Sequence, residues 1–477
     1  MEKKRIITYI IIWFILILIW FLFCYGKLKE AYYGWSSVQS FSVIEEPEIT
    51  QTVEKSIKKE ETKPIVSETV SAQEIEDNTE STLVENKMPP DTTDCNIRVL
   101  LLSNDGSIFH DEIILGYRDE TLHITKDVQY FQKTDKIRIS KTNSLEGGIK
   151  VLSTHKMYGN PVYEGVLEVR KEQEGLVLIN ELPLETYVKG VLPGEMSAGF
   201  PMEALKAQAV CARTYVMMKK AEPAFPIYNA VVDDSIASQV YMYQERNEKT
   251  DRAVEETKAQ LLYGSNQQLE ECYYYSTSCG KSATRNVWDI DAILAKDKTE
   301  NEEIEKEFRE FIENTIDSHL EKNEPFYRWT YETKVTSEDL YERCQTRNLC
   351  DKNYGAIKDI KIISRENGGV AECMEVICEN GSFQIMGEYN IRFVLSQGGN
   401  VILQNGKIYD TGELLPSAFL TISCKRNKKS HLIGYEITGG GFGHGIGMSQ
   451  NGAKYMAQAG NNYVEILQTY YEGSCVK

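Results

Sequence analysis

Residues 192–201 read LPGEMSAGFP and place one carboxylate, Glu195, between two prolines. A carboxylate in such a bend is either a hydrated loop residue or a positioned acid. The apolar neighbours Leu192, Pro193 and Met196 would raise the pKa of a glutamate that they shield from water. A carboxylic acid of raised pKa can donate a proton near neutral pH. We therefore treat Glu195 as the candidate general acid/base.

One such acid suffices for a particular kind of glycan cleavage. Most glycosidases use two carboxylates, one as acid and one as nucleophile or base. In peptidoglycan, however, the C6 hydroxyl of N-acetylmuramic acid can attack its own anomeric carbon, and the neighbouring acetamido group can share the developing charge. The enzyme then needs one group that protonates the leaving oxygen and later accepts the C6 proton.

A glycine string near the carboxyl end is a second candidate site. It comprises Gly439, Gly440, Gly441, Gly443, Gly445 and Gly447. No Gly-x-Gly-x-x-Gly pattern fits the string and no βα crossover precedes it, so a dinucleotide site is not expected. A polymer could approach such bare backbone closely, with His444 and Gln450 offering hydrogen bonds. The alternative is a flexible glycine loop in which the hydrogen bonds of His444 are made within the protein. Ser449 is a suitable N-cap for the helix that follows.

Three other patterns in the stretch STSCGKSAT are incomplete. A phosphate loop needs a glycine where Tyr275 stands. Ser278 and Lys281 have the Ser-x-x-Lys spacing of penicillin-binding proteins, but the accompanying Lys-Thr-Gly is missing. A thiol pair of Cys279 with His444 has no visible orienting group.

The elements that must position these residues form an α+β pattern. Short β-branched runs separated by turn residues predict strands from residue 97 to about 180. Residues 201–220 form the clearest helix, with an apolar stripe of Leu205, Ala209, Ala212 and Val216. A shorter helix is expected at 251–262, and more strands follow residue 324. We predict a β-rich body with a few helices packed on mixed sheets.

Residues 296–324 are polar but keep apolar side chains at helical spacing, which predicts an amphipathic surface helix. These apolar residues are Ile304, Phe308, Phe311, Ile312 and Ile316. A solvated face is the default interpretation, and docking of a partner is the alternative.

The charge distribution identifies a linker. The 477-residue chain has a net charge of −18, which argues against a nucleic-acid or anionic-lipid partner because either needs a basic face. Residues 45–94 hold 14 acids and 5 bases, a net of −9, and no aromatic residue. Such a segment cannot bury enough apolar surface to offset its ordering entropy. We predict that residues 28–94 are a disordered acidic linker.

Residues 6–23 are nearly all apolar and long enough to cross a bilayer at about 1.5 Å per residue. A cleavable signal peptide, the alternative, would have a shorter apolar region that ends in small residues, whereas this one runs into FLFCY. The preceding basic residues place the amino terminus in the cytoplasm and everything after Lys27 outside. Residues 1–27 are thus expected to be a cytoplasmic tip and a single-pass anchor in the cell membrane.

Several long motifs resemble the stage II sporulation protein D family over roughly residues 97–475. The longest is YEGVLEVRKEQEGLVLINELPLETYVKGVLPGEMSAGFPMEALKAQAVCARTYV. It is followed in the family's order by SQVY, AVEETKAQLLY, YYSTSCGKSA, FYRWT and GGGFGHGIGMSQNGA. The resemblance implies a catalytic region at 95–477 and a lytic transglycosylase that cleaves stem-peptide-free glycan strands during septal thinning and engulfment in sporulation. It also implies two partners, the amidase stage II sporulation protein P and the membrane protein stage II sporulation protein M.

The resemblance assigns further residues. Glu195 takes the position of the general acid/base, and Arg213 lies in the family's functionally sensitive Ala-Ala-Arg-Thr position. The residues expected to bind substrate are Arg213, Ser276, Ser278, Tyr327, Arg328, His444 and Gln450. A non-catalytic wall-binding scaffold or amidase enhancer on the same fold is the alternative function.

The sequence departs from the family at some positions. Ser197 stands where proline usually follows Glu-Met, and Cys279 replaces a common glycine. Some members hold zinc near this segment, but no full ligand set is visible here, with no histidine near Thr284. We therefore expect no cofactor, with zinc near Cys279 as the alternative. The ten cysteines that follow Cys24 form no Cys-x-x-Cys pair, and we expect them to be mostly free.

Overall fold

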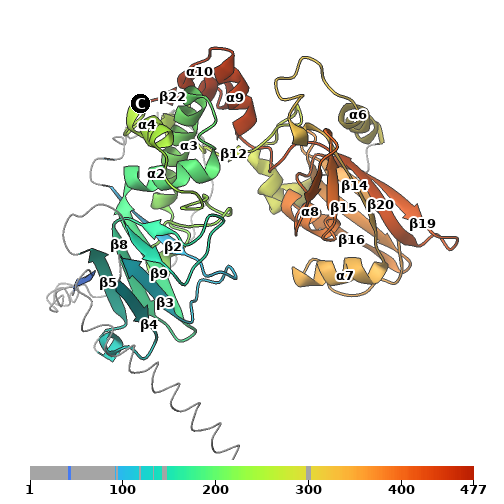
Figure 1. The fold of residues 1–477 in the computed structure, drawn as a ribbon. Helices are drawn as coiled ribbons and strands as arrows, with labels where there is room; N and C mark the ends of the chain where they lie inside the picture. Colours follow the sequence, from blue (N-terminus) through green and yellow to red (C-terminus); the bar gives the residue numbers. More distant parts are fainter. Residues whose placement is uncertain are drawn as a thin grey trace, which may run out of the picture.

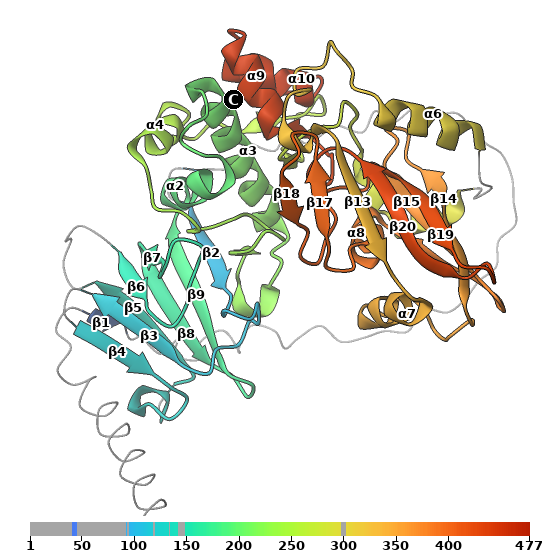
Figure 2. The same ribbon diagram turned by 45° about the vertical axis from the view of Figure 1, so that its right-hand side comes forward.

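The computed structural model describes residues 41–44, 92, 95–117, 120–132, 134–141, 148–296 and 302–477. These residues form an α+β fold with several separate sheets, as predicted. They build two bodies with separate hydrophobic cores. The first body comprises residues 41–44, 95–275 and 448–477, and the second body comprises residues 276–447. Figures 1 and 2 show the two bodies side by side.

The first body is built on two sheets. The larger has the strand order β1-β5-β8-β9-β2-β10, antiparallel except that β10 runs parallel to β2. The smaller has the order β4-β3-β6-β7. The strands are β1 (Phe41–Ile44), β2 (Asn96–Leu101), β3 (Ile113–Tyr117), β4 (Glu120–Ile124), β5 (Lys136–Lys141), β6 (Ile149–Val151), β7 (Val162–Tyr163), β8 (Val166–Lys171), β9 (Leu176–Pro183) and β10 (Val232–Asp233).

Helices cover one end of these sheets (Figure 2). They are α2 (Leu184–Glu195), α3 (Met202–Ala221), α4 (Glu248–Glu256), α9 (Gln450–Gln458) and α10 (Tyr463–Tyr470). The predicted helix at 201–220 is confirmed as α3, and Pro201 is its N-cap residue. Four fully buried alanines, Ala204, Ala207, Ala209 and Ala212, let α2, α4, α9 and α10 all pack against α3. The expected helix at 251–262 is shorter, because Leu262 and Tyr263 form strand β11 instead.

The second body is inserted between two short parallel strands, β12 (Tyr274–Tyr275) and β21 (Met448–Ser449). The chain leaves the first body at β12, builds the second body, and returns at β21 to form α9 and α10. A further small sheet, β11 (Leu262–Tyr263) with β22 (Cys475–Val476), fixes the carboxyl end against the first body. The β12–β21 pair therefore lies at the junction between the bodies (Figure 1).

The second body contains a five-stranded sheet, β18-β17-β13-β20-β19, and a three-stranded sheet, β14-β15-β16. The strands are β13 (Trp329–Lys334), β14 (Ile357–Arg365), β15 (Ala371–Cys378), β16 (Gly381–Met386), β17 (Asn400–Leu403), β18 (Ile408–Asp410), β19 (Leu420–Arg426) and β20 (Leu432–Gly439). The helices are α5 (Ile290–Ala295), α6 (Glu302–Glu313), α7 (Ser337–Thr346) and α8 (Glu388–Leu395). It also contains two short 3-10 helices, η3 (Arg285–Trp288) and η4 (Pro325–Tyr327), and the first body contains two more, η1 (Gln129–Gln132) and η2 (Pro226–Tyr228).

Helix α6 confirms the amphipathic helix predicted within residues 296–324. Phe308 and Ile312 are buried and face β19 and β20, whereas Ile304 is about half exposed. The helix ends at Glu313, and turns continue the segment to η4. Its apolar face is thus covered by its own chain, as expected of a surface helix.

Two predictions concern the amino-terminal part of the chain. Residues 41–44, which fall inside the predicted linker, form β1 and pair antiparallel with β5. The predicted membrane anchor at 6–23 lies outside the described residues. Within the described ranges, no helix is long and apolar enough to span a bilayer.

Candidate active site

Glu195 is the last residue of α2. The helix contains Pro193 and continues two residues beyond it before Met196 adopts an extended conformation. Pro193 has no N–H to donate to the carbonyl four residues earlier, so the last turn of the helix lacks that hydrogen bond. Gly194 allows the neighbouring segment to pass closely, because a Cβ there would lie 2.8 Å from the carbonyl oxygen of Val240. The helix therefore delivers Glu195 to the junction between the bodies.

The carboxylate of Glu195 is shielded but hydrogen-bonded. Its Oε1 atom accepts the backbone N–H of Val240 at 2.7 Å, and the hydroxyl of Tyr274 also bonds to the carboxylate. Leu192 and Met196 are buried beside it, as the sequence predicted. Burial raises the pKa of Glu195 to about 7, although both hydrogen bonds act in the opposite direction. Glu195 can thus hold or release a proton near neutral pH.

A relay of side chains orients the Tyr274 hydroxyl. Tyr187 donates its hydroxyl proton to Oε1 of Gln239 at 2.9 Å. The amide nitrogen of Gln239 donates to the Tyr274 hydroxyl oxygen at 3.2 Å and to the carbonyl of Ala212 at 3.3 Å. Because Tyr274 accepts from Gln239, its own proton is free to be donated to Glu195.

Sequence reasoning did not assign roles to Gln239 and Tyr274. Both belong to motifs quoted for the family resemblance, SQVY and YYSTSCGKSA. Their place in these motifs was the only sequence feature that could have marked them as candidate site residues. Their contacts with Glu195 join residues that lie far apart in the chain, so spacing alone could not reveal them.

Gln450 does lie beside Glu195. Its side-chain amide donates to the backbone carbonyl of Glu195 at 3.1 Å and to Oε1 of Gln208 at 3.5 Å. Gln450 is the first residue of α9, and Ser449 is the N-cap, as expected, accepting the N–H of Gly452 at 3.2 Å. The start of α9 therefore holds the backbone of the candidate acid.

The glycine string packs against protein backbone, which corrects the expectation of an open surface for a polymer. A Cβ on Gly447 would lie 2.0 Å from the carbonyl oxygen of Tyr273, and one on Gly440 would lie 2.5 Å from that of Tyr327. Gly447 also has a φ of +74°. The missing side chains are needed for these close approaches and for this left-handed turn.

His444 lies among aromatic rings next to this junction. Its ring centroid is 5.2 Å from that of Trp288 and 6.4 Å from that of Tyr273. Nδ1 accepts the N–H of Ile446 at 3.1 Å. Burial lowers the pKa of His444 to about 4, so the imidazole is neutral near pH 7.

The two serines differ in accessibility. Ser276 is partly exposed, and its hydroxyl lies 3.2 Å from that of Thr277. Ser278 is buried, donates to the carbonyl of Lys281 at 3.2 Å and accepts the N–H of Gly280 at 3.0 Å. The Lys281 ammonium lies instead over the ring of Phe311, so the Ser-x-x-Lys spacing does not form a nucleophile pair.

The Cys279 thiol is also unsuited to nucleophilic catalysis. The thiol is buried, with only 1% of the residue exposed, and this burial raises the pKa of Cys279 to about 11. All ten described cysteines are free, as expected. Among the described residues, no group of three or more His, Cys, Asp or Glu side chains is arranged to hold a metal ion.

Arg213 was expected to bind substrate, and the structure gives it a different place. Its guanidinium has no exposed surface and forms a two-point ion pair with Glu185 at 2.9 and 2.7 Å. It also donates to the carbonyls of Gln260 and Val254. Arg213 therefore joins α3 to α2 and to α4, and it has no surface to offer a ligand.

Tyr327 and Arg328 are likewise internal. Tyr327 is fully buried and stacks on His319, with ring centroids 5.2 Å apart. Arg328 donates to the carbonyls of Cys279 at 2.8 Å and Asn314 at 2.7 Å, which ties the segment after α6 to the STSCGKSAT stretch. Both side chains are buried and contact other parts of the second body, and their expected contact with substrate stays a prediction.

A second carboxylate was missed by the sequence reasoning. Glu321 is only 2% exposed, and burial raises its pKa to about 7. Its Oε2 atom accepts the N–H of Ser278 at 2.9 Å and the hydroxyl of Ser449 at 2.8 Å. The surrounding sequence, SHLEKNEP, is polar and carries no signal of burial.

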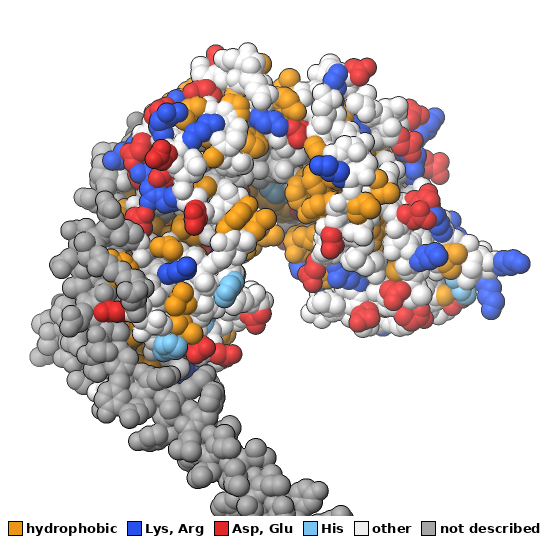
Figure 3. Space-filling view, viewed as in Figure 1, with side chains coloured by type: hydrophobic (Ala, Val, Ile, Leu, Met, Phe, Trp, Pro, Cys, Tyr) orange, Lys and Arg blue, Asp and Glu red, His pale blue; other side chains and the backbone are white. Residues whose placement is uncertain are grey.

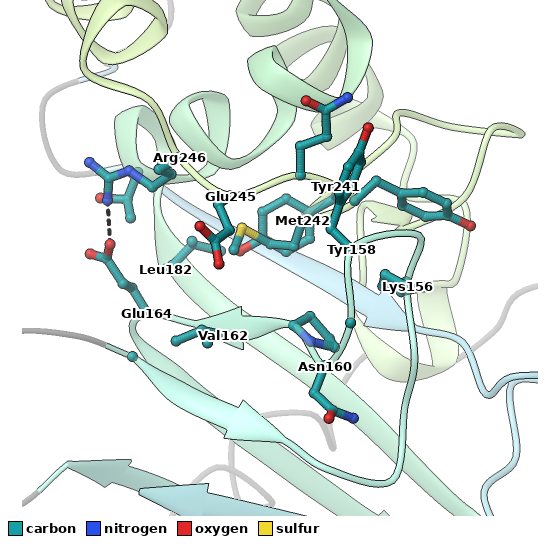
Figure 4. A pocket seen from close by; sticks show the side chains of 16 residues that line it. Lys156, Tyr158, Asn160, Val162, Glu164, Leu182, Tyr241, Met242, Glu245 and Arg246 are labelled. Atoms are coloured by element: carbon teal, nitrogen blue, oxygen red, sulfur yellow. Dashed lines mark hydrogen bonds and ion pairs between the residues drawn. The ribbon is translucent and has the colours of Figure 1, made fainter. Parts of the chain in front are cut away.

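A hollow lies between the two bodies, and hydrophobic side chains gather around it (Figure 3). A separate pocket of about 280 Å³ lies in the first body, and Glu195 and the other predicted site residues are not among the residues that line it. Figure 4 shows Glu164 and Arg246 facing one another at this pocket, with Tyr158, Tyr241 and Met242 nearby. Val240 thus contacts Glu195, and the residues that follow it, 241–246, line the pocket.

Comparison with known proteins identifies the family. The family described as "Stage II sporulation protein" matches residues 172–263, and a domain of unknown function, DUF8618, matches residues 269–447. The chain is 30% identical over 298 residues to the amidase enhancer of Bacillus subtilis, covering 60% of this chain and 40% of that protein.

Two further relatives match over most of their length. An uncharacterized protein of Brachyspira hyodysenteriae is 30% identical over 317 residues, covering 65% of this chain and 71% of that protein. The stage II sporulation protein D of Bacillus subtilis is 27% identical over 314 residues, covering 62% of this chain and 75% of that protein. With Glu195 and the motifs around it in place, we conclude that this chain belongs to the stage II sporulation protein D family.

Proposed function

We propose that this protein is a membrane-anchored lytic transglycosylase that cleaves stem-peptide-free peptidoglycan strands during sporulation. The observation that carries the proposal is Glu195 at the end of α2, a shielded carboxyl group whose pKa is raised to about 7 and which contacts Val240 and Tyr274. At pH 6 to 7 a substantial fraction of this group is protonated, which an acid catalyst requires.

The chemistry needs one such group. The protonated Glu195 donates its proton to the glycosidic oxygen as the bond from that oxygen to the anomeric carbon of N-acetylmuramic acid breaks. The C6 hydroxyl oxygen of the same sugar then bonds to the anomeric carbon, and its proton passes to the Glu195 carboxylate. The product carries a 1,6-anhydro ring, no water is consumed, and the acid regains its starting state.

The surroundings of Glu195 suit both halves of this cycle. The N–H of Val240 and the hydroxyl of Tyr274 stabilise the carboxylate after it has given up its proton, whereas burial favours the protonated acid. These opposing effects leave the pKa near 7 rather than far above it. The proposed reaction uses a single carboxylate, and it assigns no acid–base role to Glu321, which is buried and bridges Ser278 and Ser449.

The proposal includes a location and partners. We expect residues 6–23 to anchor the protein in the cell membrane with its body outside the cytoplasm, at the septum and the engulfing membrane. Stage II sporulation proteins P and M are the proposed partners, and an amidase that removes stem peptides would generate the bare strands. No cofactor enters the proposed reaction.

A wall-binding scaffold that enhances an amidase is the second candidate function. A relative at 30% identity is named an amidase enhancer, although the chain spans only 40% of that protein's length. This function would need the hollow between the bodies but not the acid–base chemistry of Glu195.

One experiment separates the two functions. Wild type and Glu195→Gln are incubated with peptide-free glycan strands, and the products are analysed by mass spectrometry for 1,6-anhydro-muramic ends. We expect these ends from wild type and none from the variant. Absence of such ends with wild type, or equal amounts with the variant, would contradict the enzyme proposal.

A further inference from the structure

Glu321 occupies a position that calls for an explanation. A buried carboxylate is costly unless the protein supplies hydrogen-bond donors to it. Here the donors are the backbone N–H of Ser278 and the hydroxyl of Ser449, both bound to the same oxygen, Oε2. The two donors lie 171 positions apart in the chain, and Glu321 itself comes from the segment after α6.

The two donors belong to the two segments that cross between the bodies. Ser278 follows β12, and Ser449 is the second residue of β21. The same segments are joined by Asn451, whose N–H donates to the carbonyl of Ser276 at 3.0 Å and whose side-chain amide donates to Thr277 at 3.0 Å. Glu321 therefore adds a bridge from the second body at the point where both crossings meet.

A short path leads from this bridge to the candidate acid. Ser449, which donates to Glu321, is also the N-cap of α9 and accepts the N–H of Gly452. The next residue, Gln450, donates its side-chain amide to the carbonyl of Glu195. The position of the α9 N-terminus thus sets the position of the acid's backbone.

We propose that Glu321 is a positioning residue for Glu195: by bridging Ser278 and Ser449 it fixes the start of α9, and through Gln450 it fixes the acid. This inference rests on the proposed function for its catalytic part. It also gives the segment at 296–324 a role, because that segment delivers the bridging carboxylate.

The packing leaves Glu321 little freedom to move. A Cβ on Gly452 would lie 2.9 Å from Oε1 of Glu321 and 1.8 Å from the hydroxyl oxygen of Tyr470. Helix α9 can approach the carboxylate this closely only because residue 452 is glycine. The bridge therefore depends on the length and placement of the side chain, and its geometry does not require a negative charge.

The test compares three substitutions of Glu321 in the full-length protein. Gln keeps the length and one acceptor oxygen but loses the charge, Asp keeps the charge but is one methylene shorter, and Ala removes both features. Glu324→Gln is the matched control, because Glu324 contacts the middle of the same helix through Tyr455 at 2.9 Å and Lys454.

Two measurements are made on each variant. The first is kcat and KM for release of 1,6-anhydro ends from peptide-free strands. The second is hydrogen exchange of the backbone amides at 276–280 and 449–453, followed by mass spectrometry. We expect Asp and Ala to lower kcat about ten- to a hundred-fold with little change in KM, and to speed exchange in both segments. Gln and the Glu324 control should stay close to wild type in both measurements.

The outcomes separate the two proposals. Normal kcat and normal exchange in the Asp variant would overturn the positioning role, and so would a Gln variant as impaired as Ala. Wild type that releases no anhydro ends would instead overturn the proposed function. In that case the exchange data still decide whether Glu321 fixes the start of α9, so the two failures are distinguishable.

Discussion

Replacing Glu195 with Gln should make the protein more stable at alkaline pH while removing glycan cleavage. Burial raises the pKa of Glu195 from 4.5 to about 7 in the folded protein. Because the folded state holds this proton more tightly than the unfolded chain, the group's stabilising contribution is complete below pH 4.5. That contribution is lost as the pH rises through 7.

The magnitude follows from the size of the pKa shift. A shift of about 2.5 pH units corresponds to about 3.4 kcal/mol at about 1.36 kcal/mol per unit. Glu195 is partly exposed, so screening by water reduces this figure, and we expect a change of about 2 kcal/mol. Glutamine has nearly the same shape and cannot ionise, so the variant should lack this loss of stability.

The assay is urea unfolding of wild type and Glu195→Gln at pH 5 and pH 8.5. The free energy of unfolding of the variant minus that of wild type should become more positive by about 2 kcal/mol between these two pH values. Glu174, which is exposed in the turn between β8 and β9, provides the matched control Glu174→Gln. A pH dependence that is the same in wild type and Glu195→Gln would show that the Glu195 carboxyl is fully hydrated, and the acid mechanism would then lose its physical basis.

Three further predictions follow from the contacts around the site. Tyr274→Phe removes a hydrogen bond that lowers the pKa of Glu195, so the alkaline limb of the pH–rate profile should move to higher pH. A limb that stays in place or moves to lower pH would contradict the contact between Tyr274 and Glu195. Arg213→Ala leaves Glu185 without its ion-pair partner and should lower the free energy of unfolding, measured by urea titration, by about 3–5 kcal/mol. A variant of normal stability that binds glycan strands weakly would instead indicate that Arg213 binds substrate. Gly447→Ala forces a Cβ to 2.0 Å from the Tyr273 carbonyl oxygen at a φ of +74°, so the thermal unfolding midpoint of this variant should fall. The control is Gly460→Ala, at an exposed position with a φ of +100° and open space around it, and its midpoint should stay clearly higher. Equal midpoints would contradict the close packing of β12 and β21.

Local sequence patterns predicted several parts of the structure correctly. The apolar residues Leu205, Ala209, Ala212 and Val216 indicated α3, and all four are fully buried. Ser449 was identified as an N-cap from its position alone. These predictions succeeded because helical periodicity and capping involve residues within a few positions of one another.

The surroundings of other residues could not be read from the sequence, because their neighbours come from distant segments. Arg213 resembles a ligand-binding residue in the sequence, but Glu185 and the carbonyls after α4 enclose it. The glycine string suggested open backbone, whereas the segment after Cys272 fills the space beside it. A sequence pattern does not state which distant segment will cover a given side chain.

The order of residues along the chain places Glu195 among apolar neighbours and next to a long helix, and the family motifs mark this region. Folding brings Val240, Tyr274 and Gln450 into contact with this acid and buries Glu321 at the start of α9. The physical reason is that desolvation and hydrogen bonding depend on every group within a few ångströms. At this junction those groups come from segments that lie far apart along the chain.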